Sequence, residues 1–312
     1  MRVLVVTNMY PTPEWPERGI FVRSQVEALQ RTGEVEVTVA AFSASGRPWE
    51  YGLQAARLAR RPERADIVHA HYGLSGIAAL GAAGRRSPLV LTVHGRDCHH
   101  PLVRPITALV ARRCAAVVAV SRELAGICPF PTADVIPVGV DLHRFQPMDR
   151  AEARQKLGLP AGERFLLFPA DPKRPEKRYE RAAALASELH VTLRSYEHTP
   201  TELVPLLINA ADAMVVTSER EGYGLACMEA LACDVPVLST PVGIAREVLP
   251  GVEGALCAPF DVGTWGAHVR KLFEQDDPHV AGRVAVAGHS TDVMARRMIA
   301  LYREVLRRAD PR

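Results

Sequence analysis

Short apolar runs alternate with longer amphipathic stretches along almost the whole chain, and this alternation constrains the fold more than any other feature. The first series of runs lies at Val3–Val6, Val35–Ala41, Asp66–Ala70, Leu89–Val93, Ala116–Val120 and Val135–Pro137. A second series lies at Arg164–Phe168, Val191–Ser195, Ala213–Thr217, Val235–Leu238 and Ala255–Cys257. Strands that alternate with helices form parallel sheets. The sequence therefore predicts an α/β protein with two doubly wound domains.

The stretches between these runs have the spacing of amphipathic helices. They lie at Gly19–Arg31, Trp49–Arg61, Leu74–Gly84 and Pro101–Arg113, then at Pro175–Leu189, Leu203–Asn209, Leu225–Cys233, Ile244–Val248 and Val262–Glu274. Asp149–Leu157 is predicted to be a connecting helix capped by its first residue. A final helix is predicted at Asp292–Arg308. The 312 residues agree with two domains of ~150 residues each.

The turn-rich run Val140–Pro147 ends the first series. We therefore place an N-terminal domain over residues 1–147 and a C-terminal domain over residues 148–291. Ligands of doubly wound sheets bind at the carboxyl ends of the strands. The cleft between the two domains is accordingly the expected site.

The composition limits the class of protein. It is 48% hydrophobic and 23% charged with mean hydropathy near zero, which excludes a disordered chain and a multispan membrane protein. The absence of a signal peptide and of an apolar run of ~18 residues predicts a cytoplasmic protein. The strong preference for Arg over Lys, with abundant Ala, is typical of GC-rich bacterial coding. Residues 1–150 carry 18 basic and 13 acidic residues, which suits an anionic substrate or membrane surface, or equally a set of solvated arginines.

The six cysteines form no CxxC pair and no metal-finger spacing. We expect reduced thiols that pack as small hydrophobes. Cys98 is followed by His99 and His100, which could indicate a metal site, but we favour a polar loop after a strand. The sequence predicts no metal site and no cofactor.

Residues 217–231 read as a strand end, a glycine-containing turn and a helix. Such a turn offers backbone N–H groups and a positive helix end to an anion. Glu229 follows Glu221 by eight residues, which in a helix covers ~12 Å at ~1.5 Å per residue. That is about the reach from a hexose across a diphosphate to a nucleoside ribose, so one carboxylate could hold sugar hydroxyls and the other the ribose. Two exposed helix carboxylates would give the same spacing.

The segment EGYGLACMEALACDVPVLSTPVG, from Glu221 to Gly243, resembles the signature of the family 4 retaining glycosyltransferases of GT-B fold. The runs DIVHAH at residues 66–71, TVHG at 92–95 and VIPVGVD at 135–141 resemble the same family. The resemblance implies two Rossmann-like domains that face each other across a cleft. It also implies metal-independent, retaining transfer of a sugar from a nucleoside-diphosphate sugar to an acceptor hydroxyl. The last helix, within residues 292–312, would pack back on the N-terminal domain.

The resemblance also implies the site residues. Lys177 matches the lysine that grips the donor diphosphate, whereas Asp171 stands where the family commonly has Arg, and we assign that role to Arg174 because a guanidinium can bind phosphate from a shifted position. The catalytic candidates are His94, Glu221, Arg174 and Lys177. The substrate-binding candidates are Gly19, His71, Gly222, Tyr223, Gly224, Leu225 and Glu229. His69 and His71 are expected to project from opposite faces of their strand, with His71 nearer the cleft.

Two other functions remain open on the sequence. Asp171, Val138 and missing glycines near Gly19 and Gly243 would suit a sugar-nucleotide-binding protein with weak or no transferase activity. A GT-B epimerase or phosphorylase is the other, whereas the absence of a G-x-G-x-x-G motif argues against a nicotinamide enzyme. The expected partners are a nucleotide-sugar donor and a saccharide, lipid-linked or small hydroxyl acceptor. Nucleic acid is not expected, and peripheral contact with the inner face of the membrane is an option.

Overall fold

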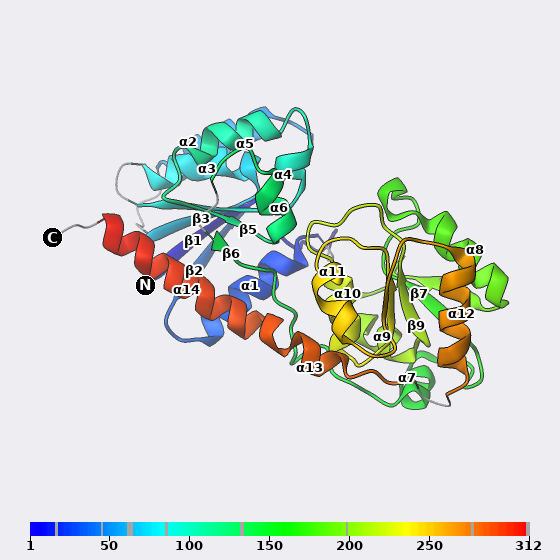
Figure 1. The fold of residues 1–312 in the computed structure, drawn as a ribbon. Coiled ribbons are helices and arrows are strands. Elements are labelled where there is room, and N and C mark those ends of the chain that lie inside the picture. Colours follow the sequence, from blue (N-terminus) through cyan, green and yellow to red (C-terminus); the bar gives the residue numbers. More distant parts are fainter. Residues whose placement is uncertain are drawn as a thin grey trace. The chain divides into compact units, whose positions relative to one another are not determined.

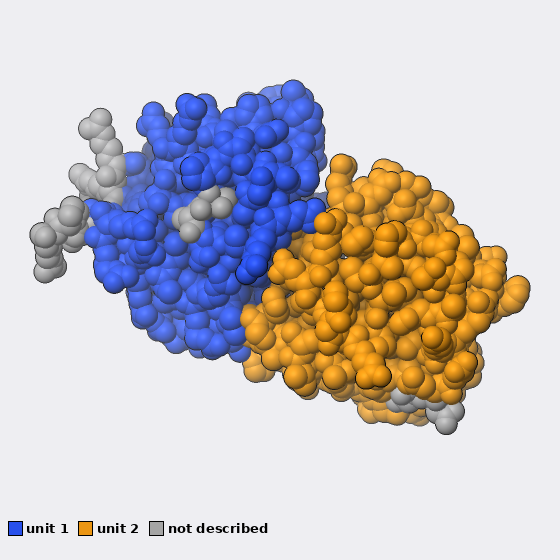
Figure 2. All heavy atoms as spheres, viewed as in Figure 1, with its two compact units in different colours: residues 1–139, 291–312 blue, residues 140–290 orange. Residues whose placement is uncertain are grey.

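The computed structural model describes residues 1–15, 18–44, 46–60, 65–84, 87–131, 134–197, 199–275 and 278–309. Its contacts divide the chain into unit 1, residues 1–139 and 291–312, and unit 2, residues 140–290 (Figure 2). The division stands before the predicted boundary at 147/148 because Arg283 donates hydrogen bonds to the carbonyls of Leu142 and Phe145, both at 2.7 Å. These bonds hold the connecting run on unit 2. Arg61, which ends a predicted helix, and residues 310–312, which end the C-terminal range expected to pack on the N-terminal domain, lie outside the described residues.

Unit 1 is built on a parallel sheet with strand order β2-β1-β3-β4-β5-β6 (Figure 1). The strands are β1 (Arg2–Thr7), β2 (Glu36–Ala41), β3 (Ile67–His71), β4 (Leu89–Val93), β5 (Ala116–Ala119) and β6 (Asp134–Val135). From β1 the chain goes to β2 on one side and then to β3 on the other. In doubly wound sheets, ligands bind at the carboxyl ends of the strands beside such a reversal, which here are β1 and β3.

Helices cover both faces of the unit 1 sheet (Figure 1). Helices α2 (Trp49–Leu58), α3 (Gly73–Ala83) and α5 (Arg104–Ala111) pack together on one face, and α1 (Ile20–Arg31) and α14 (Thr291–Ala309) on the other. The apolar stripe of α14, including Met298, Tyr302 and Val305, joins the core formed by β1, β3 and α1. The last helix therefore belongs to the folded core of unit 1. Short helices α4 (Arg96–His99) and α6 (Arg122–Ile127) follow β4 and β5 and are too short to show a period in the sequence.

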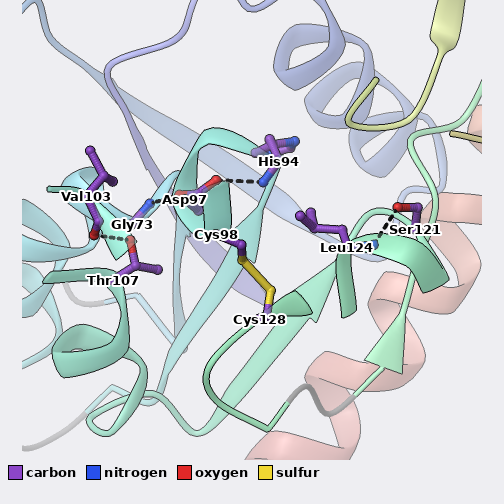
Figure 3. The surroundings of a disulfide bond; sticks show 9 residues. All are labelled: Gly73, His94, Asp97, Cys98, Val103, Thr107, Ser121, Leu124 and Cys128. Carbon is purple, nitrogen blue, oxygen red and sulfur yellow. Dashed lines mark hydrogen bonds between the residues drawn. A yellow bond between two sulfur atoms is a disulfide. The ribbon is translucent and has the colours of Figure 1, made fainter. Parts of the chain in front are cut away.

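A disulfide joins Cys98 in α4 to Cys128, the residue that ends α6 (Figure 3). The expectation that all six cysteines are reduced is wrong for this pair. The two residues are 30 apart in sequence, but neighbouring parallel strands bring the segments that follow them to the same edge of the sheet, and their Cα atoms lie 5.2 Å apart. Cys114, Cys227, Cys233 and Cys257 are free thiols.

Breaking this disulfide should destabilise unit 1, because the bond lowers the conformational entropy of the unfolded chain. We expect Cys128→Ser to lower Tm by about 5 °C. Differential scanning fluorimetry with and without dithiothreitol measures this. Reductant should lower Tm of the wild type to that of the variant, and Cys257→Ser, which removes a free thiol, is the control. An unchanged Tm of the wild type in the presence of dithiothreitol would contradict the prediction.

Unit 2 repeats the architecture with the strand order β11-β10-β9-β7-β8, all parallel. The strands are β7 (Phe165–Phe168), β8 (Thr192–Ser195), β9 (Ala213–Val216), β10 (Val237–Ser239) and β11 (Leu256–Cys257). Its first strand, β7, lies between β8 and β9. The reversal therefore stands between β7 and β9, and the loops after these two strands flank it. Together the two sheets confirm the predicted α/β class.

The helices of unit 2 are α7 (Arg150–Leu157), α8 (Tyr179–Leu189), α9 (Val204–Ala210), α10 (Leu225–Ala232), α11 (Ala245–Val248), α12 (Val262–Phe273) and α13 (Gly282–Val286), with short 3₁₀ turns at Pro175–Lys177, Thr201–Leu203, Leu249–Gly251 and Ala287–His289. Asp149 caps α7 as predicted, since its carboxylate accepts from Glu152 N at 2.8 Å. Helices α8 and α12 pack together (Figure 1). Trp265 of α12 is fully buried against Phe168 and Leu185 in one core.

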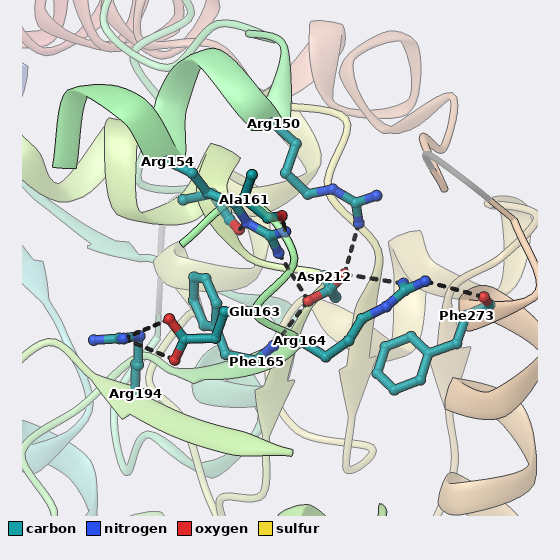
Figure 4. A network of polar contacts seen from close by, with 10 residues as sticks. Arg150, Arg154, Ala161, Glu163, Arg164, Phe165, Arg194, Asp212 and Phe273 are labelled. Atoms are coloured by element: carbon teal, nitrogen blue, oxygen red, sulfur yellow. Dashed lines mark hydrogen bonds and ion pairs between the residues drawn. The ribbon is translucent and has the colours of Figure 1, made fainter. Parts of the chain in front are cut away.

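A buried carboxylate anchors the connecting helix to this sheet (Figure 4). Asp212, 1% exposed, accepts from Arg150 at 2.7 Å, Arg154 at 3.0 Å and Arg164 at 3.2 Å. Its Oδ2 also accepts from the backbone N–H of Phe165 at 2.8 Å. The network lies at the amino ends of β7 and β9, on the edge opposite to the reversal loops. These arginines are therefore structural. Among the described residues, no helix is long and apolar enough to cross a membrane.

Candidate active site

Hydrogen bonds to backbone carbonyl groups hold the loops after β7 and β9 together. The Thr217 hydroxyl, at the end of β9, is fully buried and donates to the carbonyl oxygens of Lys177 and Arg178, both at 3.0 Å. The backbone N–H of Glu219 donates to Glu176 O at 3.0 Å. These bonds place the 3₁₀ turn Pro175–Lys177 beside the segment that precedes α10. Two side chains far apart in sequence are thereby brought to the reversal point of the sheet.

Lys177 and Glu221 meet at this point. The ammonium Nζ of Lys177 lies 2.6 Å from Glu221 Oε1, and the Ser218 hydroxyl donates to the same oxygen at 2.7 Å. The Lys177 and Glu221 side chains are 13% and 15% exposed. An ammonium has three N–H donors, so Lys177 can hold Glu221 and an anionic ligand at once. The structure thus brings together two of the predicted catalytic residues.

The turn before α10 presents the start of that helix. Gly224, the N-cap residue, has φ 93°, a conformation that favours glycine, and it has no side chain with which to cap the first N–H groups of the helix. Gly243 packs against the carbonyl of Tyr223, where a Cβ would collide, and Ile244 N donates to that carbonyl at 2.8 Å. The single glycine at 243 therefore suffices to support the turn. Gly222 and Leu225, both predicted substrate contacts, are partly exposed beside it.

Two predicted residues of unit 2 have partners of their own. Arg174 is 55% exposed and binds Glu176 Oε1 through Nε at 3.0 Å and Nη2 at 2.6 Å. Two of the five N–H donors of its guanidinium are thus engaged by Glu176. Tyr223 is 5% exposed, its hydroxyl lies 3.3 Å from His289 Nδ1, and burial raises its pKa. The Tyr223 side chain therefore packs in the interior, and only its backbone lines the turn.

Glu229 lies on α10 in low-dielectric surroundings. Burial raises the pKa of Glu229 to about 7, against a smaller opposing effect of the Arg144 charge. The neighbouring Tyr196 follows β8, and its buried hydroxyl has no hydrogen-bond partner among the described residues. Burial and the Glu229 charge both raise the pKa of Tyr196. Tyr196 was not predicted from the sequence, although it lies directly after a strand, where ligand-binding residues of such sheets are found.

The predicted residues of unit 1 lie at the carboxyl ends of β1, β3 and β4. His71 ends β3 and is fully buried, and its Nδ1 lies 3.0 Å from Nε2 of His94, which follows β4. The rings of His69 and His71 are 4.4 Å apart, so the expectation of opposite faces is wrong: residues two apart on a strand share a face. His69 Nδ1 lies 2.6 Å from the Tyr302 hydroxyl and its Nε2 2.8 Å from that of Thr92.

Gly19, at the start of α1, has φ 68° and packs against the backbone of Met9 and Tyr10, where a Cβ would collide. The residue is therefore required to bring α1 close to the loop after β1. This close contact explains why position 19 is a glycine.

Asp97 is a second residue that the sequence did not single out (Figure 3). The carboxylate is fully buried and accepts from the backbone N–H of His94 at 2.7 Å and from that of Gly73, the first residue of α3. Burial raises the pKa of Asp97 to about 6, against the opposing effect of these N–H groups. Asp97 thus links the segments after β3 and β4 that carry His71 and His94.

Asp97→Asn should misplace the His94 backbone, because an amide offers one acceptor oxygen where the carboxylate offers two. We expect kcat/KM to fall about tenfold, the equivalent of one buried N–H left unpaired. Asp66→Asn is the matched control, since Asp66 also accepts from a backbone N–H, that of Arg2 at 2.7 Å, away from the histidines. Steady-state kinetics and Tm are measured on both variants. Wild-type kinetics for Asp97→Asn would contradict the assignment.

Among the described residues, no three His, Cys, Asp or Glu side chains gather in a way that could hold a metal ion. The possible site at Cys98, His99 and His100 is overturned, because the Cys98 sulfur is in the disulfide. The predicted polar loop there is instead helix α4, with Cys98 4% exposed.

A parallel-stranded unit with a cation and an open helix start at its reversal point is typical of proteins that bind phosphorylated ligands. Comparison with known proteins defines the class. Residues 1–144 match the model of Glycosyltransferase Family 4, and residues 161–281 match that of Glycosyl transferases group 1. The chain belongs to the family 4 glycosyltransferases, and it is a glycosyltransferase of GT-B type.

Curated relatives include the D-inositol 3-phosphate glycosyltransferase of Mycolicibacterium gilvum (strain PYR-GCK), 30% identical over 91% of this chain and 74% of that protein. The enzyme of the same name from Actinosynnema mirum is 31% identical over 71% and 67%. Similar solved structures include Anabaena HepE in complex with UDP and glucose, with TM-score 0.75, 18% identity and coverage of 97% and 100%. A glycosyltransferase from Rickettsia africae ESF-5 has TM-score 0.76, 16% identity and coverage of 98% for both chains. These two structures share the fold.

Proposed function

We propose that this glycosyltransferase transfers a sugar from a nucleoside-diphosphate sugar to an acceptor hydroxyl with retention of the anomeric configuration. The pair of Lys177 and Glu221 beside the uncapped start of α10 carries this proposal. It puts a cation and helix N–H groups where a diphosphate needs them, and a carboxylate where sugar hydroxyls need an acceptor. The complexes of HepE with UDP, and with UDP and glucose, support a nucleotide-sugar donor.

In the proposed reaction the bond between the anomeric carbon and the diphosphate oxygen breaks. The acceptor oxygen bonds to the same face of that carbon, and the acceptor proton passes to the departing phosphate oxygen. Negative charge grows on the diphosphate as the bond breaks, so fixed positive groups there favour the transition state. Lys177 and the start of α10 supply them, with Arg174 as a third through the N–H donors that Glu176 does not engage. This arrangement supports transfer without a bound metal.

Glu221 and Glu229 divide the donor between them in this proposal. Glu221 accepts from hydroxyls of the sugar, and Glu229, eight residues further on, accepts from the ribose hydroxyls. A sugar-nucleotide-binding protein without transferase activity is not favoured, because Lys177 and Glu221 are both in place. Among the described residues, no contact favours an epimerase or a phosphorylase either.

A two-stage experiment tests the proposal. UDP, GDP and ADP are first screened by thermal shift, since a ligand that binds the native state raises Tm. The sugar nucleotides of the best base are then incubated with D-inositol 3-phosphate, suggested by the names of the relatives, and with saccharide and lipid-linked acceptors. We expect release of nucleoside diphosphate to match the glycosylated product, with the same rate in the presence of EDTA. Binding without transfer to any acceptor would overturn the proposal.

A further inference from the structure

The two nitrogens of the His94 ring are not equivalent. Its Nε2 lies 3.0 Å from Nδ1 of His71, and the two rings stack with centroids 5.3 Å apart and planes 21° from parallel. Phe21 of α1 packs on His94 at a centroid distance of 4.8 Å. Because Nε2 is occupied by His71, Nδ1 is the nitrogen of His94 that can reach a ligand.

The direction of this hydrogen bond follows from the other side of His71. Its Nε2 lies 3.5 Å from Nε2 of Gln25, a side chain of α1 that is 7% exposed. An amide nitrogen only donates, so Nε2 of His71 is the acceptor and its ring proton is on Nδ1. That proton is donated to His94 Nε2. The neutral His94 ring must then carry its own proton on Nδ1.

Both rings are held in the neutral state by their surroundings. Burial lowers the pKa of His94 to about 3, and burial together with the neighbouring histidines His69 and His94 lowers the pKa of His71 well below its usual range. Neither ring gains a second proton near neutral pH. A neutral ring with its proton on Nδ1 is a hydrogen-bond donor toward a ligand and cannot accept a proton at that nitrogen.

We propose that His71 is a positioning residue that fixes the tautomer of His94, so that His94 offers a substrate hydroxyl a neutral Nδ1–H donor. This assigns His71 a role behind His94, in place of the direct substrate contact expected from the sequence, because the His71 side chain is fully buried. The kinetic consequence rests on the proposed function. The tautomer itself does not.

Variants at position 71 test whether an N–H donor, and not merely a polar side chain, is needed beside Nε2 of His94. The side-chain nitrogen of His71→Asn can take the place of Nδ1 and donate, whereas His71→Asp presents only acceptor oxygens there. We expect two-bond ¹H–¹⁵N correlation spectra of ¹⁵N-histidine-labelled protein at pH 7 to show His94 protonated on Nδ1 in the wild type and in His71→Asn. In His71→Asp the His94 proton should move to Nε2, or the ring should become doubly protonated. His94→Asn assigns the signals.

Kinetics then report the consequence for transfer. We expect His71→Asn to stay within about threefold of wild-type kcat, and His71→Asp to lose more than about tenfold in kcat with little change in donor KM. His69→Asn is the matched control, since it alters an equally buried ring that bonds Tyr302 and Thr92 and makes no hydrogen bond to His94. This control should leave the His94 tautomer unchanged.

A wild-type His94 protonated on Nε2 would overturn the proposal, as would a His71→Asp variant that keeps the Nδ1–H tautomer. The spectra need no sugar nucleotide, so a protein without transferase activity would defeat the proposed function and leave the tautomer test intact. If His71→Asp does not fold, His71→Leu offers neither donor nor acceptor to His94. Retention of full kcat and of the Nδ1–H tautomer in that variant would equally overturn the proposal.

Discussion

Replacing Lys177 with Met lowers kcat/KM for sugar transfer by about 10²–10³-fold, the usual effect of removing one fixed donor from a developing negative charge. The Lys177 side chain is 13% exposed, Glu221 holds its ammonium at the reversal point, and the Thr217 hydroxyl holds its backbone carbonyl. Because the ammonium is fixed in the structure without a donor, it would stabilise charge on the departing diphosphate of the proposed reaction without reorganisation. The measurement is steady-state kinetics with saturating acceptor.

Lys173 gives a matched control in the same loop. It is 77% exposed and binds Glu197 at 2.9 Å, away from Glu221. We expect Lys173→Met to keep wild-type kcat/KM within about threefold, because an exposed ion pair contributes little. Arg174→Met should fall between the two variants, because this guanidinium is bound to Glu176. Equal activity of Lys177→Met and Lys173→Met would contradict the role of Lys177.

Glu229→Ala weakens donor binding, whereas Glu221→Ala acts mainly on turnover. A carboxylate that accepts from two ribose hydroxyls contributes at least about 1.5 kcal/mol per bond, or about 3 kcal/mol for the two, so we expect the Kd of the nucleoside diphosphate to rise by at least about 100-fold in Glu229→Ala. Glu221→Ala should change this Kd little, because the free nucleotide carries no sugar for Glu221 to hold, but it should lower kcat. Isothermal titration calorimetry and kinetics on both variants test the contrast. Equal Kd and equal kcat in the two variants would contradict it.

The proton on Glu229 adds a pH dependence. The pKa of Glu229 is about 7, and only the ionised form can accept from both hydroxyls. Donor affinity should therefore rise from pH 6 to pH 8 in the wild type and stay flat in Glu229→Gln. Stability runs the other way, because the folded pKa lies above the unfolded value of about 4.3. Between these values the folded chain binds more protons, so the contribution of Glu229 to stability falls as pH rises through this window and is absent in Glu229→Gln.

The architecture was predictable because its signals are local. Buried parallel strands are continuous apolar runs, and the strand Leu89–Val93 was placed to the residue. Three of the short helices, α4, α6 and α13, were missed, because four to six residues give at most a weak period. The equally short α11 was predicted, at Ile244–Val248. The boundary between the domains lies after residue 139, not after the predicted residue 147. Residues 140–147 belong to unit 2 because Arg283, far along the chain, hydrogen-bonds to their backbone, and the sequence pattern does not show this contact.

The site was predictable only as far as its motifs reach. Lys177 and Glu221 were found because each follows a strand in a motif, and the order of the strands brings the two loops together. What the motifs could not give were contacts that depend on how side chains are placed in space. The disulfide and the bond from Gly73 N–H to Asp97 join different segments of the chain. The pairing of Arg174 with Glu176, two residues away, depends on the conformation of both side chains.

The anomeric configuration of the product tests the central claim most directly. The donor is the sugar nucleotide selected by the binding screen, with its anomeric configuration known, and the transfer product is followed by ¹H NMR from the first turnovers. We predict that the anomeric proton of the product has the coupling of the same configuration as the donor, with one nucleoside diphosphate released per product. A product of the opposite configuration, or nucleotide release without a glycosylated product, would contradict the account.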